Sequence, residues 1–389
     1  MIFEVSQMNG TNGNIRVGNL FGIPFYVNVS WFLVLALVTW NYGSGLAGAF
    51  PSLLGTTPWL LGLLAALLLF ASVLAHELGH SFAALKQGIG VNSITLFLFG
   101  GLAALEKEST SPGGAFKVAI AGPGVSLALF AALFAMSHLW PLGGAIGAIV
   151  SLLTYINLAL GVFNLLPGLP LDGGNVVKSI VWRVTGSPHK GLAFASRMGQ
   201  VIGWLAIAVG AAAVAGLSPL GNVWTLLIGW FLLSNANRSA QSASVQQRLA
   251  GLTAADATTG DSPMVAQSTS LRAFADDVLL RMVGNWRKFL VMDEAGELIG
   301  TVSVDALQAV PRDRWATVTV AHIMSPERSL TTIVADQSLL EVVQILDEKK
   351  LSALAVRQEN GQLLGLLEKQ TIAKLLQGAL PQARAATAD

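Results

Sequence analysis

A run of 18 uncharged, mostly apolar residues, from Pro58 to Ala75, constrains the fold of this chain more than any other feature. A helix needs about 20 such residues to span a lipid bilayer. His76, Glu77 and His80 follow the run directly, so three ionisable side chains lie within five positions. Ionisable groups at membrane depth are costly and are usually retained for a function. The run therefore predicts a membrane helix with a functional site near its end.

The charge distribution indicates where the membrane part of the chain ends. Residues 1–240 hold nine Lys or Arg and five Asp or Glu, a formal net charge of +4, whereas residues 241–389 hold 14 bases and 17 acids, a net charge of −3. The whole chain is 53% hydrophobic and 12% charged, against about 25% charged in soluble proteins. We predict a polytopic α-helical membrane domain over 1–240, joined to a soluble α/β region. The polar start of the chain lacks the pattern of a cleavable signal peptide.

About six stretches are long and apolar enough to span a bilayer. They cover residues 25–44, 58–83, 115–138, 143–166, 191–214 and 220–236. The segments between them alternate between charged and uncharged, and positive charge marks the cytoplasmic side. We therefore expect a multi-pass protein of the cell membrane with both termini in the cytoplasm. The histidine pair should then lie in the cytoplasmic half of the bilayer.

The spacing of His76 and His80 predicts a metal site, because positions i and i+4 share one face of a helix. Zinc in a catalytic site takes three protein ligands and keeps one open position. The chain has no cysteine, so the ligands must be histidine and carboxylate. Glu77 is next to His76 and is expected to act as a general base on water. This His-Glu-x-x-His pattern is typical of zinc peptidases, and one zinc ion per chain is expected.

Asp172 is the best candidate for the third ligand. It follows the fourth stretch, so it should emerge on the same side of the membrane as His76 and His80. Prolines and the pair Gly173-Gly174 flank it, which allows irregular backbone to line a cavity. The alternative is a turn residue before the glycines. Asn164 could donate a hydrogen bond to the oxyanion of the reaction, or it could bond only to a neighbouring helix.

Residues 91–105 alternate β-prone side chains before Gly100-Gly101, which predicts a short membrane-associated β element near the metal. Its open edge could pair with an unwound substrate strand; the alternative is a re-entrant loop that only packs. The small residues of Ala121–Ser126 predict close helix packing, and no chemistry is assigned to them.

Together these motifs resemble the site-2 protease family of intramembrane metalloproteases. The resemblance rests on HELGH at 76–80, FGG at 99–101, AGPGVS at 121–126 and FNLLPGLPLDGG at 163–174. It implies that His76, His80 and Asp172 bind zinc and that Glu77 is the general base, and it supports a catalytic role for Asn164. It also implies regulated intramembrane proteolysis, in which transmembrane segments of single-span, membrane-tethered proteins are cut.

The soluble half contains an internal repeat. Residues 291–300 recur as 356–365, and each copy is flanked by amphipathic segments that predict helices. The repeat resembles a tandem pair of cystathionine-β-synthase (CBS) domains, which we place at 253–312 and 318–380 after a linker at 241–252.

CBS pairs commonly bind adenine nucleotides, but the ribose-binding acid is one place early in the first repeat (Asp305) and absent from the second. Adenine nucleotide binding is therefore an open hypothesis, and a module for homodimerisation or substrate gating without a ligand is the alternative.

For the whole chain, the alternative function is a CBS-regulated ion transporter or channel, which would have no need for the zinc-ligand spacing. The expected partners are single-span membrane proteins and the lipid bilayer, with no nucleic acid.

Overall fold

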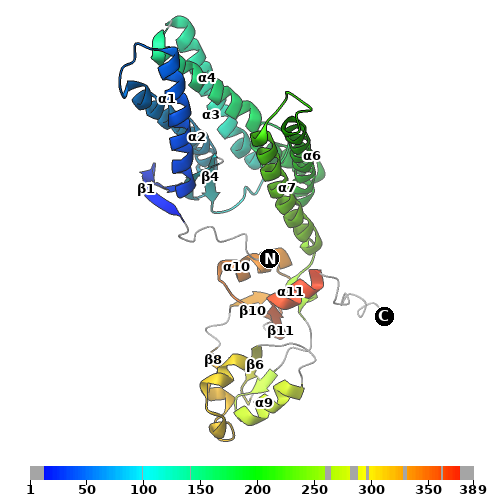
Figure 1. Ribbon diagram of the computed structural model, residues 1–389. Coiled ribbons are helices and arrows are strands. Elements are labelled where there is room, and N and C mark those ends of the chain that lie inside the picture. The colour runs from blue at the N-terminus through cyan, green and yellow to red at the C-terminus, as the bar shows by residue number, and fades with distance from the viewer. Residues whose placement is uncertain are drawn as a thin grey trace. The chain divides into compact units, whose positions relative to one another are not determined.

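The computed structural model describes residues 13–98, 100–140, 142–258, 264–280, 288–294, 298–326, 331–360 and 362–376. The chain forms two compact units, one within residues 9–244 and one within residues 245–389. Figure 1 shows long helices in the first unit and small mixed sheets in the second.

Five helices among the described residues are long and apolar enough to cross a membrane. They are α1 (Val29–Ala49), α2 (Thr57–Leu85), α3 (Pro112–Leu139), α4 (Gly144–Asn164) and α6 (Pro188–Val214). The sixth predicted stretch lies in α7 (Val223–Leu249), which is not among these five because its second half is polar. Between α4 and α6 runs a shorter amphipathic helix, α5 (Asp172–Thr185).

Local sequence signals set the ends of several helices. The Asn28 side chain caps α1 by accepting a hydrogen bond from the Ser30 N–H, and Ser111 caps α3 by accepting one from Gly114. Both residues are of the types that favour this position. Gly186 follows the last residue of α5 in the left-handed backbone conformation, which a residue without Cβ adopts easily.

A four-stranded sheet accompanies the helices, in the order β1 (Asn14–Leu20), β2 (Ile23–Asn28), β3 (Val91–Phe97) and β4 (Gly100–Leu105). The pairs β1–β2 and β3–β4 are antiparallel, and β2–β3 is parallel. The β element predicted at 91–105 is thus confirmed as a hairpin, although Phe99 lies outside the described residues. The first helix begins at Val29 rather than at the predicted residue 25, because residues 23–28 form β2.

Small residues bring α2 close to its neighbours. The Cα of Gly62 lies against Gly43 of α1, and the Cα of Gly79 faces the Ala121 carbonyl of α3, so a Cβ at either glycine would collide with backbone. Such close approach is typical of membrane helices, which gain contact by bringing their backbones together. The histidine-bearing helix α2 is therefore held firmly between α1 and α3.

The soluble unit contains two sheets with the same strand-pairing register. Lys288 pairs with Ser303 in β6 (Lys288–Met292) and β7 (Leu298–Ser303), and Ala353 pairs with Glu368 in β10 (Ala353–Arg357) and β11 (Leu363–Glu368). Among the described residues, this unit also contains β5 (Met264–Ala266), β8 (Ser325–Pro326), β9 (Thr332–Val334), α8 (Ala254–Ala257), α9 (Leu271–Leu280), α10 (Leu339–Glu348), α11 (Lys369–Leu376) and three short 3₁₀ turns. Both strands of the second hairpin follow their counterparts in the first by the same offset as the sequence repeat, so the structure repeats where the sequence does.

Candidate metal centre

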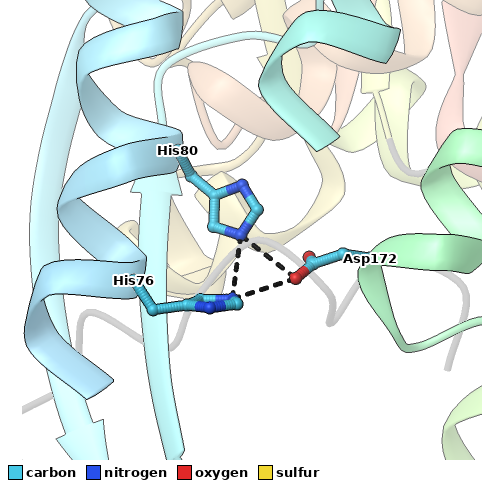
Figure 2. Close-up of side chains that lie close together, drawn as sticks. All are labelled: His76, His80 and Asp172. Atoms are coloured by element: carbon cyan, nitrogen blue, oxygen red, sulfur yellow. Dashed lines mark hydrogen bonds and ion pairs between the residues drawn. The ribbon is translucent and has the colours of Figure 1, made fainter. Parts of the chain in front are cut away.

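Three side chains predicted as ligands converge at one point (Figure 2). The Asp172 Oδ2 atom lies 3.0 Å from the Nε2 of His76 and 3.2 Å from the Nε2 of His80. The two Nε2 atoms are 3.3 Å apart. Both histidines are buried, and the carboxylate is partly so. Among the described residues, this is the group of histidine and carboxylate side chains that could hold a metal ion.

The two elements that carry these side chains are far apart in sequence. His76 and His80 lie one turn apart on α2, whereas Asp172 is the first residue of α5. A carboxylate is favoured in the first turn of a helix by the unpaired N–H groups and by the helix dipole. The i, i+4 spacing thus explains why His76 and His80 share a face of α2, and the helix start explains why a carboxylate is favoured at Asp172.

The loop between α4 and α5 is fixed by α6, which in turn places Asp172. The Leu169 N–H donates to the Ala195 carbonyl of α6 at 3.1 Å. The loop also packs directly on Gly199 of α6. A Cβ at Gly199 would overlap the Leu169 carbonyl, and a Cβ at Gly168 would collide with the Gly199 backbone. The position of the third ligand therefore depends on a helix that the sequence did not connect with the site.

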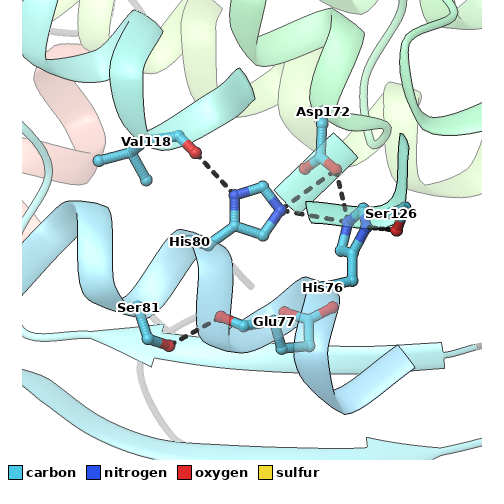
Figure 3. A network of polar contacts seen from close by, with 7 residues as sticks. All are labelled: His76, Glu77, His80, Ser81, Val118, Ser126 and Asp172. Atoms are coloured by element: carbon cyan, nitrogen blue, oxygen red, sulfur yellow. Dashed lines mark hydrogen bonds and ion pairs between the residues drawn. The ribbon is translucent and has the colours of Figure 1, made fainter. Parts of the chain in front are cut away.

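The second nitrogen of each imidazole is also bound (Figure 3). The Nδ1 of His80 is 2.7 Å from the Val118 carbonyl. A carbonyl can only accept, so this Nδ1 carries the proton and Nε2 is free to bind a metal. The Nδ1 of His76 is 2.9 Å from the hydroxyl of Ser126, which is fully buried. Such contacts fix the orientation of metal-ligating histidines.

Val118 and Ser126 both belong to α3, and so does Gly122, which lies against the two Nε2 atoms. A Cβ at Gly122 would overlap the Nε2 of His80 and come within 2.7 Å of the Nε2 of His76. The sequence reasoning assigned no chemistry to residues 121–126, so it missed both Gly122 and Ser126. The signal available was a hydroxyl among apolar and small residues in the middle of the span.

The donor set fits zinc. Two neutral imidazole nitrogens and one carboxylate oxygen are the kind of ligands that catalytic zinc takes, and their ligand atoms lie within 4.8 Å of one another. Gly122 leaves the space beside the Nε2 atoms without a side chain. The three residues can therefore hold one ion and leave a position open.

Glu77 is outside this triangle and borders strand β4. A Cβ on Gly101 would lie 2.9 Å from the Cδ of Glu77 and 3.0 Å from its Oε1. One turn further along α2, the Ser81 hydroxyl donates a hydrogen bond to the backbone carbonyl of Glu77 at 2.9 Å (Figure 3). The Glu77 side chain thus lies where α2 meets β4, and its role as the general base stays a prediction.

The other candidates are placed as follows. Asn164 is the last residue of α4 and is half-buried, and its catalytic role stays a prediction. Asn157 of α4 is fully buried and donates to the Ser72 hydroxyl of α2 at 3.0 Å, which links the two helices. Glu108 is exposed in the segment after β4 and forms an ion pair with Lys178 of α5 at 2.6 Å.

Comparison with known proteins agrees with this geometry. The chain matches Peptidase family M50 over residues 64–143 and 141–206, and the CBS domain family over residues 320–378. It is 55% identical over 94% of its length to the "Putative zinc metalloprotease sll0528" of Synechocystis, of which 96% is covered. It is 34% identical over 93% of its length to Rip3 of Mycobacterium tuberculosis, which carries the same description and is covered over 92%.

Among solved structures, the "Site-2 Protease from Methanocaldococcus jannaschii" is 27% identical to this chain. The similarity covers 58% of this chain and 95% of that one, with a TM-score of 0.42.

Proposed function

The chain belongs to peptidase family M50, the site-2 protease family of zinc metalloproteases, and on this premise we propose that it cuts transmembrane segments of membrane-tethered, single-span proteins. The observation that carries the proposal is the placement of the zinc ligands. His76 and His80 lie on α2, a helix apolar and long enough to cross a membrane. A peptide bond that reaches them must itself come from within or beside the bilayer. The spacing of the ligands and the family together leave no support for the transporter alternative.

The chemistry of the site divides between the ligands and the base. Zinc, when bound, supplies Lewis-acid chemistry: it polarises the scissile carbonyl and makes water more acidic. His76, His80 and Asp172 would hold the ion, with the two imidazoles oriented by Ser126 and Val118. Glu77 takes a proton from the attacking water and passes it to the leaving amine.

Asn164 is proposed to assist this reaction. Its side-chain amide would donate a hydrogen bond to the carbonyl oxygen as negative charge develops there. Its position at the end of α4, shortly before Asp172 in the sequence, supports this role.

Strand β4 is proposed to present the substrate to Glu77. It lies at the end of the described sheet, and Gly101 in this strand contacts the Glu77 side chain. An unwound substrate segment could add to this edge by backbone hydrogen bonds, which carry no sequence preference. A helix must unwind before its peptide bonds can be cut, so such an edge suits a transmembrane substrate.

The soluble unit is proposed to be a CBS pair that regulates the protease, with repeats at 253–312 and 318–380 and a linker at 241–252. The matched register of the two sheets supports the pairing of the repeats. Adenine nucleotide in the cleft of the pair and homodimerisation through it are the two regulatory hypotheses. Thermal shifts of the full-length protein with ATP and with AMP would test nucleotide binding, and its mass in detergent would test homodimerisation.

We propose further that both termini are cytoplasmic, as the positive connecting segments favour.

The variant Glu77→Gln tests the proposed reaction. Because Gln cannot accept the proton, the variant should lose cleavage of a reconstituted single-span substrate, while zinc analysis of the same sample should still find one ion per chain. The matched control is Glu106→Gln, the same exchange at an exposed carboxylate, which should leave cleavage unchanged. Cleavage by the Glu77→Gln protein, or purified wild-type protein without zinc, would contradict the mechanism.

A further inference from the structure

The turn that joins β1 to β2 has an unusual residue at its tip. The turn consists of Phe21 and Gly22, and both residues have positive φ. Two-residue hairpin turns with positive φ at both positions strongly prefer Asn or Asp followed by Gly. A bulky aromatic residue in the left-handed region is a genuine outlier. Such strain is retained where the side chain has a task.

The Phe21 side chain is 73% exposed, so burial in the core does not offset this strain. Its ring contacts that of Phe82 on α2, with ring centroids 5.3 Å apart in an edge-to-face arrangement. Phe82 is itself 38% exposed on a helix that qualifies as a membrane span. The tip of the hairpin is thus continuous with the exposed apolar surface at the end of α2.

Strand pairing shows that the hairpin has two different faces. Ile15 pairs with Val27 and Leu20 with Ile23, so these four side chains share a face with the buried part of the sheet. Ile15 nevertheless remains 49% exposed, and β1 is an outer strand of the described sheet.

The opposite face of β1 carries polar side chains. Arg16 and Asn19 both lie there, opposite Tyr26 and Pro24, and the Arg16 guanidinium donates to the Asn19 side chain at 3.0 Å. An exposed apolar face backed by a polar face, at the end of a membrane helix, is what a segment lying in the bilayer interface requires.

We propose that the β1–β2 hairpin is a membrane anchor, in which Phe21 and Ile15 enter the lipid beside Phe82 while Arg16 and Asn19 face headgroups and water. The partner is the bilayer itself. Because the four strands are hydrogen-bonded in one sheet, an anchored β1 also fixes the depth of β4 beside Glu77. The inference does not rest on the proposed substrate; it needs only the membrane-spanning helices.

The absence of cysteine from the sequence allows a clean test in the full-length protein. Phe21→Cys and Asn19→Cys would each carry one nitroxide label in phosphatidylcholine–phosphatidylglycerol vesicles. At position 21, collisions with oxygen, which concentrates in lipid, should exceed those with a water-soluble nickel chelate. At position 19, nearby on the polar face, the order should reverse. Zinc content equal to that of the unsubstituted protein shows that each variant is folded.

Two results at position 21 would overturn the proposal. Nickel collisions in excess of oxygen would place the hairpin in water, and low values for both reagents would mean that protein, a substrate or a second copy covers it. A label at Ile15→Cys gives a second reading that does not alter the turn.

Adding Phe21→Asn to the Ile15→Cys protein separates strain from anchoring. Asn tolerates the left-handed conformation, so the turn should form at least as readily, while the reading at position 15 should move towards water. An unchanged reading would show that Phe21 does not hold the hairpin in lipid.

Discussion

At the scale of single residues, the site depends on side chains that bind no metal. Ser126 contacts the Nδ1 of His76, and Gly122 leaves room beside the Nε2 atoms. Both belong to the third span, at positions where a membrane helix needs only small residues to pack. Their roles follow from how close they lie to the imidazoles of α2. The sequence of α3 alone does not indicate this proximity.

Substitution of Ser126 by Ala should weaken zinc binding. It removes the hydrogen bond that orients His76, and loss of such contacts typically costs about 10- to 100-fold in metal affinity. Competition with a zinc chelator in detergent would measure the affinity. Ser137→Ala is the matched control on the same helix, because this exposed hydroxyl bonds locally, to the Phe134 carbonyl and the adjacent His138. Equal affinities for the two variants would argue against an orienting role for Ser126.

Substitution of Gly122 by Ala should abolish zinc binding, because the added methyl group would overlap the Nε2 of His80. Gly124→Ala provides the control further along α3, where a Cβ would meet nothing within 4 Å. Zinc content of the two purified proteins is the measurement. A full complement of zinc in the Gly122→Ala protein would contradict the placement of the site.

At the scale of elements, α6 has a role beyond crossing the membrane. It holds the loop that leads to Asp172 through the Leu169–Ala195 hydrogen bond and the close approach of Gly199. The same helix packs against α7 at Gly210, where a Cβ would collide with Leu226. One helix therefore positions a ligand near its start and packs against its neighbour near its end.

Comparison of Gly199→Ala with Gly210→Ala separates these two roles. Gly199→Ala should displace Leu169 and with it Asp172, and a displacement of about 1 Å can cost about 100-fold in rate. Gly210→Ala strains only the contact with α7, so it should lower stability more than the rate measured per bound zinc. Cleavage rate and thermal unfolding of both proteins would be measured. Similar losses of rate in the two variants would show that α6 acts only through general packing.

At the scale of the whole molecule, the two units have separate cores. The core of the second repeat is formed by fully buried residues such as Leu354, Leu367 and Ile372. The membrane unit buries its own set, including Ala65, Ile149 and Leu153. Zinc binding should therefore not require a stable soluble unit.

Leu354→Ala tests this independence. Removing a buried leucine side chain typically costs about 2–5 kcal/mol, so the soluble unit should become sensitive to protease. Zinc content of the membrane unit should remain that of the unsubstituted protein. Limited proteolysis with zinc analysis of the same sample would check both. Loss of zinc together with loss of protease resistance would mean that the units fold as one.

The sequence by itself determined the parts of this protein that depend on short-range patterns. Long apolar stretches indicated the five helices that can cross a membrane, the i, i+4 spacing paired His76 with His80, and the scarcity of acids in the membrane half indicated Asp172. It also predicted the β element at 91–105 and the internal repeat of the soluble half. A short apolar run cannot distinguish a strand from a helix start, so residues 25–28, which belong to β2, were predicted as the start of a span.

Only the tertiary structure decided which distant segments meet at the metal centre. It paired β2 with β3 in parallel although α1 and α2 separate them in the chain, placed α3 against both imidazoles and fixed Asp172 through α6. It also showed that α7, which holds most of the last predicted stretch, is one continuous helix from Val223 to Leu249 and so runs well past residue 236. The physical reason is that hydrophobicity specifies burial in lipid but not the neighbour. The neighbour is chosen by close packing at small residues and by a few buried polar groups that must find partners.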